Sequence, residues 1–336
     1  MQKELTGTPQ LLEKRGELAN FGWGRGIQAN FTKKELGLKA YKLQEWDTYY
    51  VQNEECRAVF TLAGTGMSVC MVVCLMETSK NRACTSKQVK PMITGPIPFP
   101  PHSKAGDIVF ATARAGLTFV KSATERFIKS EVLDFFEGVN LTANLTLDQA
   151  GQEGFTDIIP LSEPGSFLYN QKIGCMSVSG TIRFGGTEYK FKPEDSFGYL
   201  DWGRSMLPPG FKRNHCYVMG WVDGMPFAVS LGYGYNDNQS ITENYIMYQG
   251  VCHKLEKTLF EIPQNNASPW YIVTSDSRLR LKFFPEIWAG SDSIAGPYGV
   301  QGTIVCGKFL GKVILDDGTI LDIGALSGFA RLERQK

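Results

Sequence analysis

The sequence is poor in histidine and in the short motifs that mark common cofactor sites. It has only three histidines, His102, His215 and His253, and their separations match no metal-ligand spacing. It also contains no G-x-G-x-x-G, no P-loop, no H-E-x-x-H and no G-x-S-x-G motif, which argues against nucleotide binding, zinc-protease chemistry and serine-hydrolase chemistry. We therefore expect neither a metal nor another cofactor.

Strong charge imbalance and long hydrophobic segments are also absent. The 35 basic and 34 acidic residues nearly cancel, and without a basic run we do not expect nucleic acid as a partner. The longest apolar run, Met67–Met76, is too short to cross a bilayer, and Met1–Phe21 lacks the apolar segment of a secretory signal. These features predict a cytoplasmic protein with no integral membrane segment. They do not indicate its oligomeric state.

What the sequence does contain is many short runs of β-forming residues separated by turn signals. Ala58–Leu62 and Ile108–Thr112 are two such runs, and Asp317-Gly318 is a two-residue turn of the kind found in hairpins. This pattern predicts an all-β protein of antiparallel barrel or sandwich type. Two helices are expected, at Lys33–Tyr41 and at Ser122–Phe136.

One irregular stretch, Lys192–Lys212, interrupts this pattern of strands. It contains Pro208-Pro209 and several glycines, and strand-rich sequence of comparable length lies on both sides of it. The prediction is two β domains, residues 1–200 and 201–336, joined at a corner that contains Asp201-Trp202-Gly203-Arg204.

Three clusters in the sequence combine acidic and aromatic residues, and these clusters indicate a candidate site of acid catalysis. They are Glu45-Trp46-Asp47, Asp201-Trp202-Gly203-Arg204 and Thr242-Glu243-Asn244-Tyr245. An acid packed against tryptophan in an apolar wall has a raised pKa, so it can keep its proton near neutral pH and donate it. One hypothesis is that Asp201, Asp47 or Glu45 protonates an alkene or an epoxide, while Trp and Tyr rings stabilise the cationic intermediate.

A structural interpretation of the same residues is also open. Asp201 would then cap a turn or pair with Arg204, and Trp202 would fill the core between the domains. His215, at the start of a strand, is either a hydrogen-bonded wall residue or a general base. Both interpretations stay open at this point.

Motifs along the whole chain resemble those of a known family. Tyr169–Gly203 is similar to the signature of two-domain lipocalin-like proteins, which include carotenoid hydratase, tocopherol cyclase and kievitone hydratase. Within that group the chain resembles the family called domain of unknown function 2804. The segments that carry this resemblance are Glu4–Leu12, L-x-E-W-D-x-Y-Y at Leu43–Tyr50, P-E-D-S-F-G-x-L-D-W-G-R at Pro193–Arg204, L-G-Y-G at Leu231–Gly234 and T-E-N at Thr242–Asn244.

The resemblance implies two lipocalin-like antiparallel β-barrels or sandwiches, with a ligand within or between them. The implied function is binding of a hydrophobic small molecule (an isoprenoid, a lipid or a polyaromatic), with acid-catalysed hydration, cyclisation or isomerisation as the activity. The alternative is a non-catalytic lipid carrier or sensor. Asp201, Asp47 and Glu45 are the candidate catalytic residues. The candidate ligand-binding residues are Trp46, Tyr49, Trp202, Arg204, His215, Tyr217, Tyr233, Glu243 and Asn244.

One local difference from the related enzymes leads to a further expectation. The enzymes separate their Asp and Trp by two residues, whereas Asp201 and Trp202 are adjacent. Adjacent side chains on an extended strand point to opposite faces. We therefore expect Asp201 and Trp202 to lie on different sides of a sheet.

Overall fold

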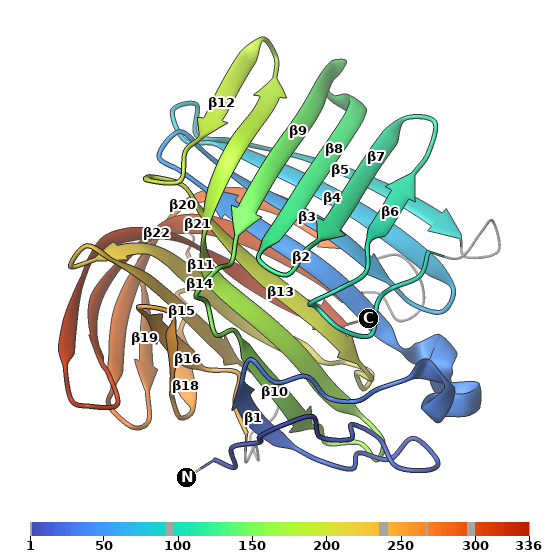
Figure 1. Ribbon diagram of the computed structural model, residues 1–336. Helices are drawn as coiled ribbons and strands as arrows, with labels where there is room; N and C mark the ends of the chain where they lie inside the picture. Colours follow the sequence, from blue (N-terminus) through green and yellow to red (C-terminus); the bar gives the residue numbers. More distant parts are fainter. Residues whose placement is uncertain (1, 92–96, 235–240, 266–267, 294–299, 336) are drawn as a thin grey trace.

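The computed structural model describes residues 2–91, 97–234, 241–265, 268–293 and 300–335. Within these residues the chain forms two antiparallel β-sheets, each curled into a half-barrel (Figure 1). The first sheet is built from the first part of the chain and the second sheet from the rest. The predicted all-β fold of two antiparallel modules is confirmed.

The first sheet has 13 strands, ten of which follow one another across it. The remaining three branch from β11: β10 and β12 pair with β11, and β1 pairs with β10. In spatial order the ten strands are β5 (Arg82–Pro91), β4 (Ser68–Glu77), β3 (Cys56–Gly64), β2 (Gln44–Gln52), β13 (Phe197–Ser205), β11 (Phe167–Phe184), β9 (Val139–Asp148), β8 (Glu125–Phe136), β7 (Ala115–Lys121) and β6 (Ile108–Ala111). The branch strands are β1 (Gly22–Arg25), β10 (Phe155–Pro160) and β12 (Thr187–Phe191).

The second sheet has nine strands in a single path. Its members are β17 (Val251–Lys254), β16 (Tyr245–Tyr248), β15 (Met225–Tyr233), β14 (Lys212–Val222), β22 (Ile320–Gln335), β21 (Val300–Ile314), β20 (Leu279–Ser293), β19 (Trp270–Thr274) and β18 (Thr258–Glu261). Figure 1 shows β20, β21 and β22 passing behind the strands of the first sheet, and β20 contacts both β4 and β5.

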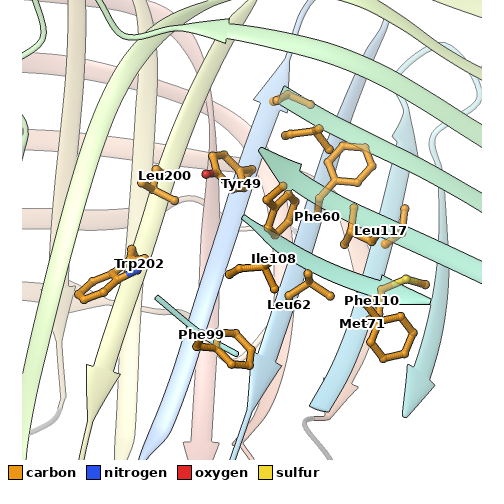
Figure 2. Close-up of a cluster of buried hydrophobic side chains, with 14 of the residues drawn as sticks. Tyr49, Phe60, Leu62, Met71, Phe99, Ile108, Phe110, Leu117, Leu200 and Trp202 are labelled. Atoms are coloured by element: carbon orange, nitrogen blue, oxygen red, sulfur yellow. The ribbon is translucent and has the colours of Figure 1, made fainter. Parts of the chain in front are cut away.

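The strands at the centre of the molecule bury both of their faces. Almost every residue of β2, β3, β4 and β13 is buried, because one face closes the first half-barrel and the other meets the second sheet. On the inner face, Tyr49, Phe60, Leu62, Leu117 and Trp202 belong to one apolar core (Figure 2). The outer face belongs to a separate inter-sheet core. This central layer is where the predicted site residues lie.

The D-W-G-R segment lies on the last strand before the chain changes sheets. Asp201–Arg204 is part of β13 and pairs with β2 along its length, and the chain crosses to the second sheet between Ser205 and Lys212. The crossing contains Pro208-Pro209, in which proline cannot donate to a ladder. The division into domains 1–200 and 201–336 stays a prediction.

The two helix predictions have different outcomes. The first is confirmed as 3-10 helical structure, η1 at Lys33–Lys42, which is kinked by a non-helical backbone at Gly37. The second is wrong, because Glu125–Phe136 is strand β8, whose residues are alternately buried and exposed along most of its length. Among the described residues no helix is both long enough and apolar enough to cross a membrane.

Candidate functional site

Strands β2 and β13 lie side by side and carry many of the predicted site residues. Their register places Trp202 opposite Asp47. It places Arg204 opposite Glu45. Trp202 packs in the core of the first half-barrel, whereas Asp201 bonds to a residue of the second sheet. The expectation that Asp201 and Trp202 face opposite sides is therefore confirmed, and the site has two faces.

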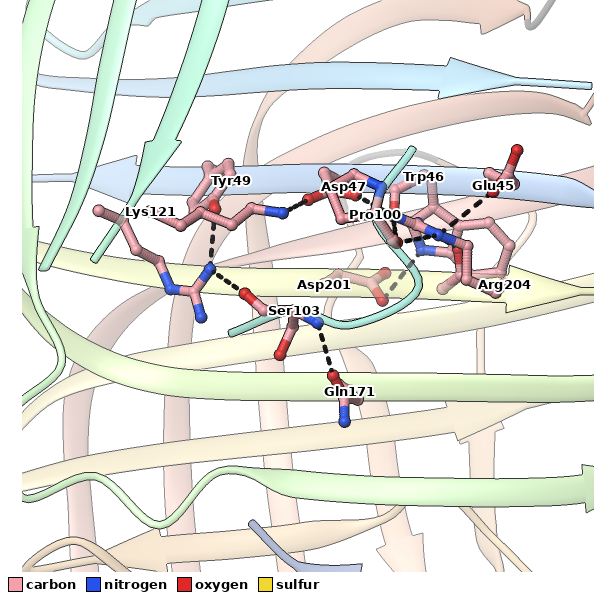
Figure 3. A network of polar contacts seen from close by, with 12 residues as sticks. Glu45, Trp46, Asp47, Tyr49, Pro100, Ser103, Lys121, Gln171, Asp201 and Arg204 are labelled. Atoms are coloured by element: carbon pink, nitrogen blue, oxygen red, sulfur yellow. Dashed lines mark hydrogen bonds and ion pairs between the residues drawn. The ribbon is translucent and has the colours of Figure 1, made fainter. Parts of the chain in front are cut away.

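On the inner face Asp47 forms two ion pairs (Figure 3). Its Oδ2 accepts a 2.7 Å hydrogen bond from Nζ of Lys121, and its Oδ1 accepts a 2.9 Å bond from Nη2 of Arg204. All three side chains are fully buried. Burial by itself raises the pKa of Asp47, but the two cations outweigh this effect and lower the pKa below its ordinary value. Asp47 is therefore a counter-ion for two buried cations and does not retain a proton.

The pKa of Glu45 moves in the opposite direction. Burial raises it, and attraction to Arg204 and Lys33 offsets this only in part. Oε2 of Glu45 accepts a hydrogen bond from Lys33, and Oε1 lies 3.4 Å from Nε of Arg204. Glu45 therefore holds a proton more readily than an ordinary glutamate, which is the property that the sequence hypothesis asks of an acid.

Arg204, Trp202 and Tyr49 are held in place by neighbours within the first half-barrel. The guanidinium of Arg204 lies 4.2 Å from the centre of the Trp202 ring and donates a 2.9 Å hydrogen bond to the carbonyl oxygen of Pro100. The hydroxyl oxygen of Tyr49 accepts a 3.2 Å bond from Nη1 of Arg126 (Figure 3). These contacts stabilise the interior of the half-barrel without a ligand.

Asp201 lies on the other face, between the two sheets. Its Oδ2 accepts a 2.6 Å hydrogen bond from the Tyr217 hydroxyl, and its Oδ1 accepts a 3.3 Å bond from Nε1 of Trp46. Nη1 of Arg213 lies 3.9 Å from Oδ2. All three neighbours present N–H or O–H groups, so Asp201 is an acceptor in this arrangement.

Gly203 allows Trp46 to reach Asp201. A Cβ at residue 203 would lie 2.0 Å from Cζ2 of Trp46, so the indole can cross the β13 backbone only because no side chain stands there. The two motifs E-W-D and D-W-G-R therefore fit together across neighbouring strands. Trp46 supplies the ring, Gly203 supplies the space and Asp201 accepts the indole N–H.

The L-G-Y-G and T-E-N segments meet at a second buried ion cluster. Nε of Arg213 donates to Oε1 of Glu243 at 2.7 Å, while Nη2 of Arg213 and Nζ of Lys172 both donate to Oε2. Burial raises the pKa of Glu243, but Arg213 and Lys172 outweigh it and lower the pKa to about 2. Gly232 leaves room for this carboxylate, since a Cβ there would lie 1.9 Å from Oε1. Asn244 Oδ1 accepts a 2.7 Å bond from the Gly232 N–H.

Asp157, on β10, is a buried acid that the sequence hypothesis did not include. Its Oδ1 accepts a 3.2 Å hydrogen bond from Nδ2 of Asn170, whereas its Oδ2 is buried without a hydrogen-bond partner. Burial raises the pKa of Asp157 to about 7, and attraction to Lys172 offsets this only in part. The signal was present in the sequence, because aspartate is a poor strand residue and here it interrupts the apolar run Phe155–Pro160.

The remaining predicted ligand residues lie in different places. The rings of His215 and Tyr217 are 5.0 Å apart in the inter-sheet layer, and the pKa of His215 lies well below its ordinary value because of burial and the charge of Arg213. Tyr233 stacks on Phe260, 5.9 Å away, against the core of the second half-barrel, and is apart from the others. Within the described ranges, no group of three or more His, Cys, Asp or Glu side chains is placed to hold a metal ion.

A cavity between the sheets, which we call the Asp201 cavity, brings several of these residues together. It is a narrow slot with a volume of about 30 Å³. Its lining residues are Gln44, Glu45, Trp46, Thr48, Thr61, Ala63, Gly64, Leu168, Asp201, Leu207, Phe211, Arg213 and Arg331.

The sequence as a whole matches one protein family over residues 2–336, the family described as domain of unknown function (DUF2804). The chain belongs to this family. The predicted relationship is confirmed over almost the entire chain. No curated protein matches the chain in sequence.

Solved structures with the same fold give this DUF2804 protein its structural neighbours. The crystal structure of CghA with Sch210972 has a TM-score of 0.57 at 12% identity, covering 87% of this chain and 88% of that one. Kievitone hydratase from Nectria haematococca has a TM-score of 0.54 at 10% identity, with coverage of 87% and 88%. An AttH-like protein from Nitrosomonas europaea has a TM-score of 0.52 at 12% identity, with coverage of 90% and 96%. At these identities the likeness is one of fold.

Proposed function

We propose that the protein binds a hydrophobic small molecule at the Asp201 cavity and transfers a proton to it, so that the ligand is hydrated, cyclised or isomerised. One observation carries this proposal. Asp201 lines this inter-sheet cavity with Trp46 and Arg213, and Glu45 also borders it, with its carboxyl beside Arg204 on the inner face of β2. A cavity with few converging polar groups beside aromatic rings is the usual form of a small-molecule site.

The two carboxyl residues suit different tasks in proton transfer. The pKa of Glu45 is raised by burial, so we assign it the role of proton donor. Asp201 is surrounded by donors, so we assign it the role of the group that accepts a proton or faces a developing positive charge. Because the Glu45 carboxyl lies beside Arg204, transfer of its proton requires the carboxyl to turn toward the cavity at the start of β2.

The other lining groups fit a cationic intermediate and its capture by water. The face of the Trp46 ring attracts positive charge. The hydroxyl groups of Thr48 and Thr61 are 3.1 Å apart and both residues line the cavity, so they form a polar pair at which a water molecule can bind. Kievitone hydratase is named as a hydratase, and its similar fold supports a hydration reaction for this chain.

The narrowness of the slot limits how a ligand enters it. With an enclosed space of about 30 Å³, the slot accepts only the reacting end of a lipid or isoprenoid. Leu207 and Phe211 line it from the segment that crosses between the sheets, so a shift of this segment is what would admit more of the ligand.

The experiment uses the full-length protein with three probes: geranylgeraniol, linoleic acid and pyrene. Native mass spectrometry first detects any guest that co-purifies and any probe that binds. The probes are then extracted after incubation and analysed by mass spectrometry. Hydration adds the mass of one water, whereas cyclisation or isomerisation gives a product of unchanged mass with a different retention time.

The variants Glu45→Gln and Asp201→Asn keep the shape of each side chain and remove its acid. We expect both variants to bind the same molecules with turnover reduced at least about a hundredfold, the usual contribution of general acid-base catalysis. Glu131→Gln, an exposed change on β8, is the matched control and should leave turnover unchanged. Binding without any turnover by the unmodified protein would favour the lipid carrier or sensor, and the absence of both a guest and probe binding would refute the proposal.

A further inference from the structure

A second cavity opens at the other end of the inter-sheet layer. It has a volume of about 300 Å³, which lies at the lower end of the range for small-molecule sites. Tyr50 separates it from the Asp201 cavity, because on the inter-sheet face of β2 Thr48 lines the first cavity and Gln52 lines the second. The residues that line the second cavity are Gln52, Asn53, Glu54, Glu194, Asp195, Phe197, Met219, Gly220, Trp221, Lys308, Ala325, Leu326 and Ser327.

The side-chain amide of Gln52 is buried, and its oxygen atom Oε1 accepts no hydrogen bond from any described residue. Nε2 of Gln52 donates 3.1 Å hydrogen bonds to the carbonyl oxygens of Met219 and Ser327. This fixes the orientation of the amide, because the flipped form would place its oxygen against two other oxygens. Oε1 is left without a hydrogen-bond partner in the interior, where Gln52 is only 1% exposed. A ligand that brings an N–H or O–H group would satisfy it.

Two aromatic rings form an apolar wall of the same cavity. Phe197 and Trp221 are in edge-to-face contact with ring centres 5.8 Å apart. Trp221 comes from the second sheet and is 42% exposed, and its Nε1 donates a 3.0 Å bond to the carbonyl oxygen of Glu194. The indole N–H is thus already used, so what the ring still presents to a ligand is its face, which attracts cations.

The charged residues around the cavity favour a cation. Glu54, Glu194 and Asp195 contribute three negative charges, and Lys308 contributes one positive charge. Nζ of Lys308 donates a 2.8 Å bond to Oγ of Ser327, which ties this charge to strand β22. The excess of negative charge attracts a cation and repels an anion.

We propose that this second cavity binds a protonated amine that carries an aromatic or alkyl group. The apolar group packs against Phe197 and Trp221, the ammonium lies near Glu194 and Asp195, and one ammonium N–H donates to Oε1 of Gln52. The site is independent of the reaction at the Asp201 cavity. The protein would then bind two different ligands, a cationic amine at this cavity and an uncharged hydrophobic molecule at the Asp201 cavity.

Calorimetric titration of the full-length protein with four phenethyl compounds tests this assignment. The compounds are phenethylamine, its N,N,N-trimethyl derivative, the neutral 2-phenylethanol and the anionic 3-phenylpropionate. We expect phenethylamine to bind saturably and at least about fivefold more tightly than the trimethyl derivative, which has no N–H for Gln52. The alcohol should bind more weakly than the amine, and the anion should not bind.

Two surface variants locate the binding. Trp221→Leu should weaken phenethylamine binding about two- to fivefold, the size of an exposed cation–π contact. The double change Glu194→Gln and Asp195→Asn should weaken it by a similar factor and reduce its dependence on salt. Tyr271→Leu, at an exposed ring on β19, is the matched control and should change nothing. The proposal is overturned if the alcohol binds as tightly as the amine, if Trp221→Leu binds like the unmodified protein, or if no compound binds saturably.

Discussion

Replacing Gly203 with alanine tests whether the Trp46 indole is positioned by the missing side chain. An ideal Cβ at residue 203 would lie 2.0 Å from Cζ2 and 2.3 Å from Cε2 of the ring. Ordinary carbon contacts begin near 3.5 Å, so the ring must move by about 1.5 Å. The 3.3 Å hydrogen bond from Nε1 of Trp46 to Asp201 then breaks.

The expected cost follows from these two losses. Overpacking a close contact costs about 1–3 kcal/mol, and loss of the hydrogen bond adds about 1 kcal/mol. Gly203→Ala should therefore lower the free energy of unfolding by about 2–4 kcal/mol. In a Trp46→Ala background the clash is gone. There the same change should be neutral or stabilising by about 0.5–1 kcal/mol, since alanine suits a strand better than glycine.

A double-mutant cycle measures the difference. Urea unfolding of the four proteins is followed by circular dichroism, because fluorescence would change with Trp46 itself. A coupling of about 2 kcal/mol or more between residues 46 and 203 is the expected result. If Gly203→Ala costs the same with and without Trp46, the argument that Gly203 makes room for the ring is refuted.

Two further changes test the buried charges. The pKa of Asp157 is about 7 in the folded protein, whereas an aspartate in the unfolded chain releases its proton near pH 4. Between about pH 4 and 7 the folded state therefore binds one more proton than the unfolded state. The free energy of unfolding consequently falls as the pH rises through this window. The variant Asp157→Asn lacks this proton uptake, so its free energy of unfolding in urea should rise relative to that of the unmodified protein by up to about 1.4 kcal/mol for each pH unit in the window. If the difference between the two free energies does not change with pH, the assigned titration is contradicted. Asp47→Asn leaves Lys121 and Arg204 without their counter-ion and should cost about 3–5 kcal/mol in thermal unfolding. Asp322→Asn, at an exposed pair, is the control, and an equally small effect at Asp47 would show that this ion pair does not stabilise the fold.

The sequence contained the information for β8, although a helix was expected there. From Arg126 to Val132 every second residue is buried, and Ile128 and Val132 face the core while Lys129 and Glu131 face solvent. That spacing of two is the spacing of a half-buried strand. The charged residues between the apolar ones obscured it.

The candidate site was recoverable only in part. The motif E-W-D pointed to Glu45 and Asp47 together, and the two acids nevertheless have pKa shifts in opposite directions. Asp47 meets Lys121 from β7 in addition to Arg204, and no spacing along the chain brings β7 next to β2. The direction in which the pKa of Asp47 shifts depends on that long-range contact.

Asp201 and Trp202 show the complementary case. Their adjacency on an extended strand was enough to predict that they face opposite sides, because alternation is a property of the local backbone. What each one touches was not predictable. The partner of Asp201 is Tyr217 of the other sheet, and its place is set by the way the two sheets pack.

The sequence by itself determined the all-β fold and the family, because local alternation and short motifs are enough to indicate both. The tertiary structure decided which charges meet, where the two cavities lie and in which direction the pKa of each buried acid shifts. The physical reason is that a pKa and a cavity depend on burial and on neighbours within a few ångströms. In this protein those neighbours come from strands that are far apart in the chain.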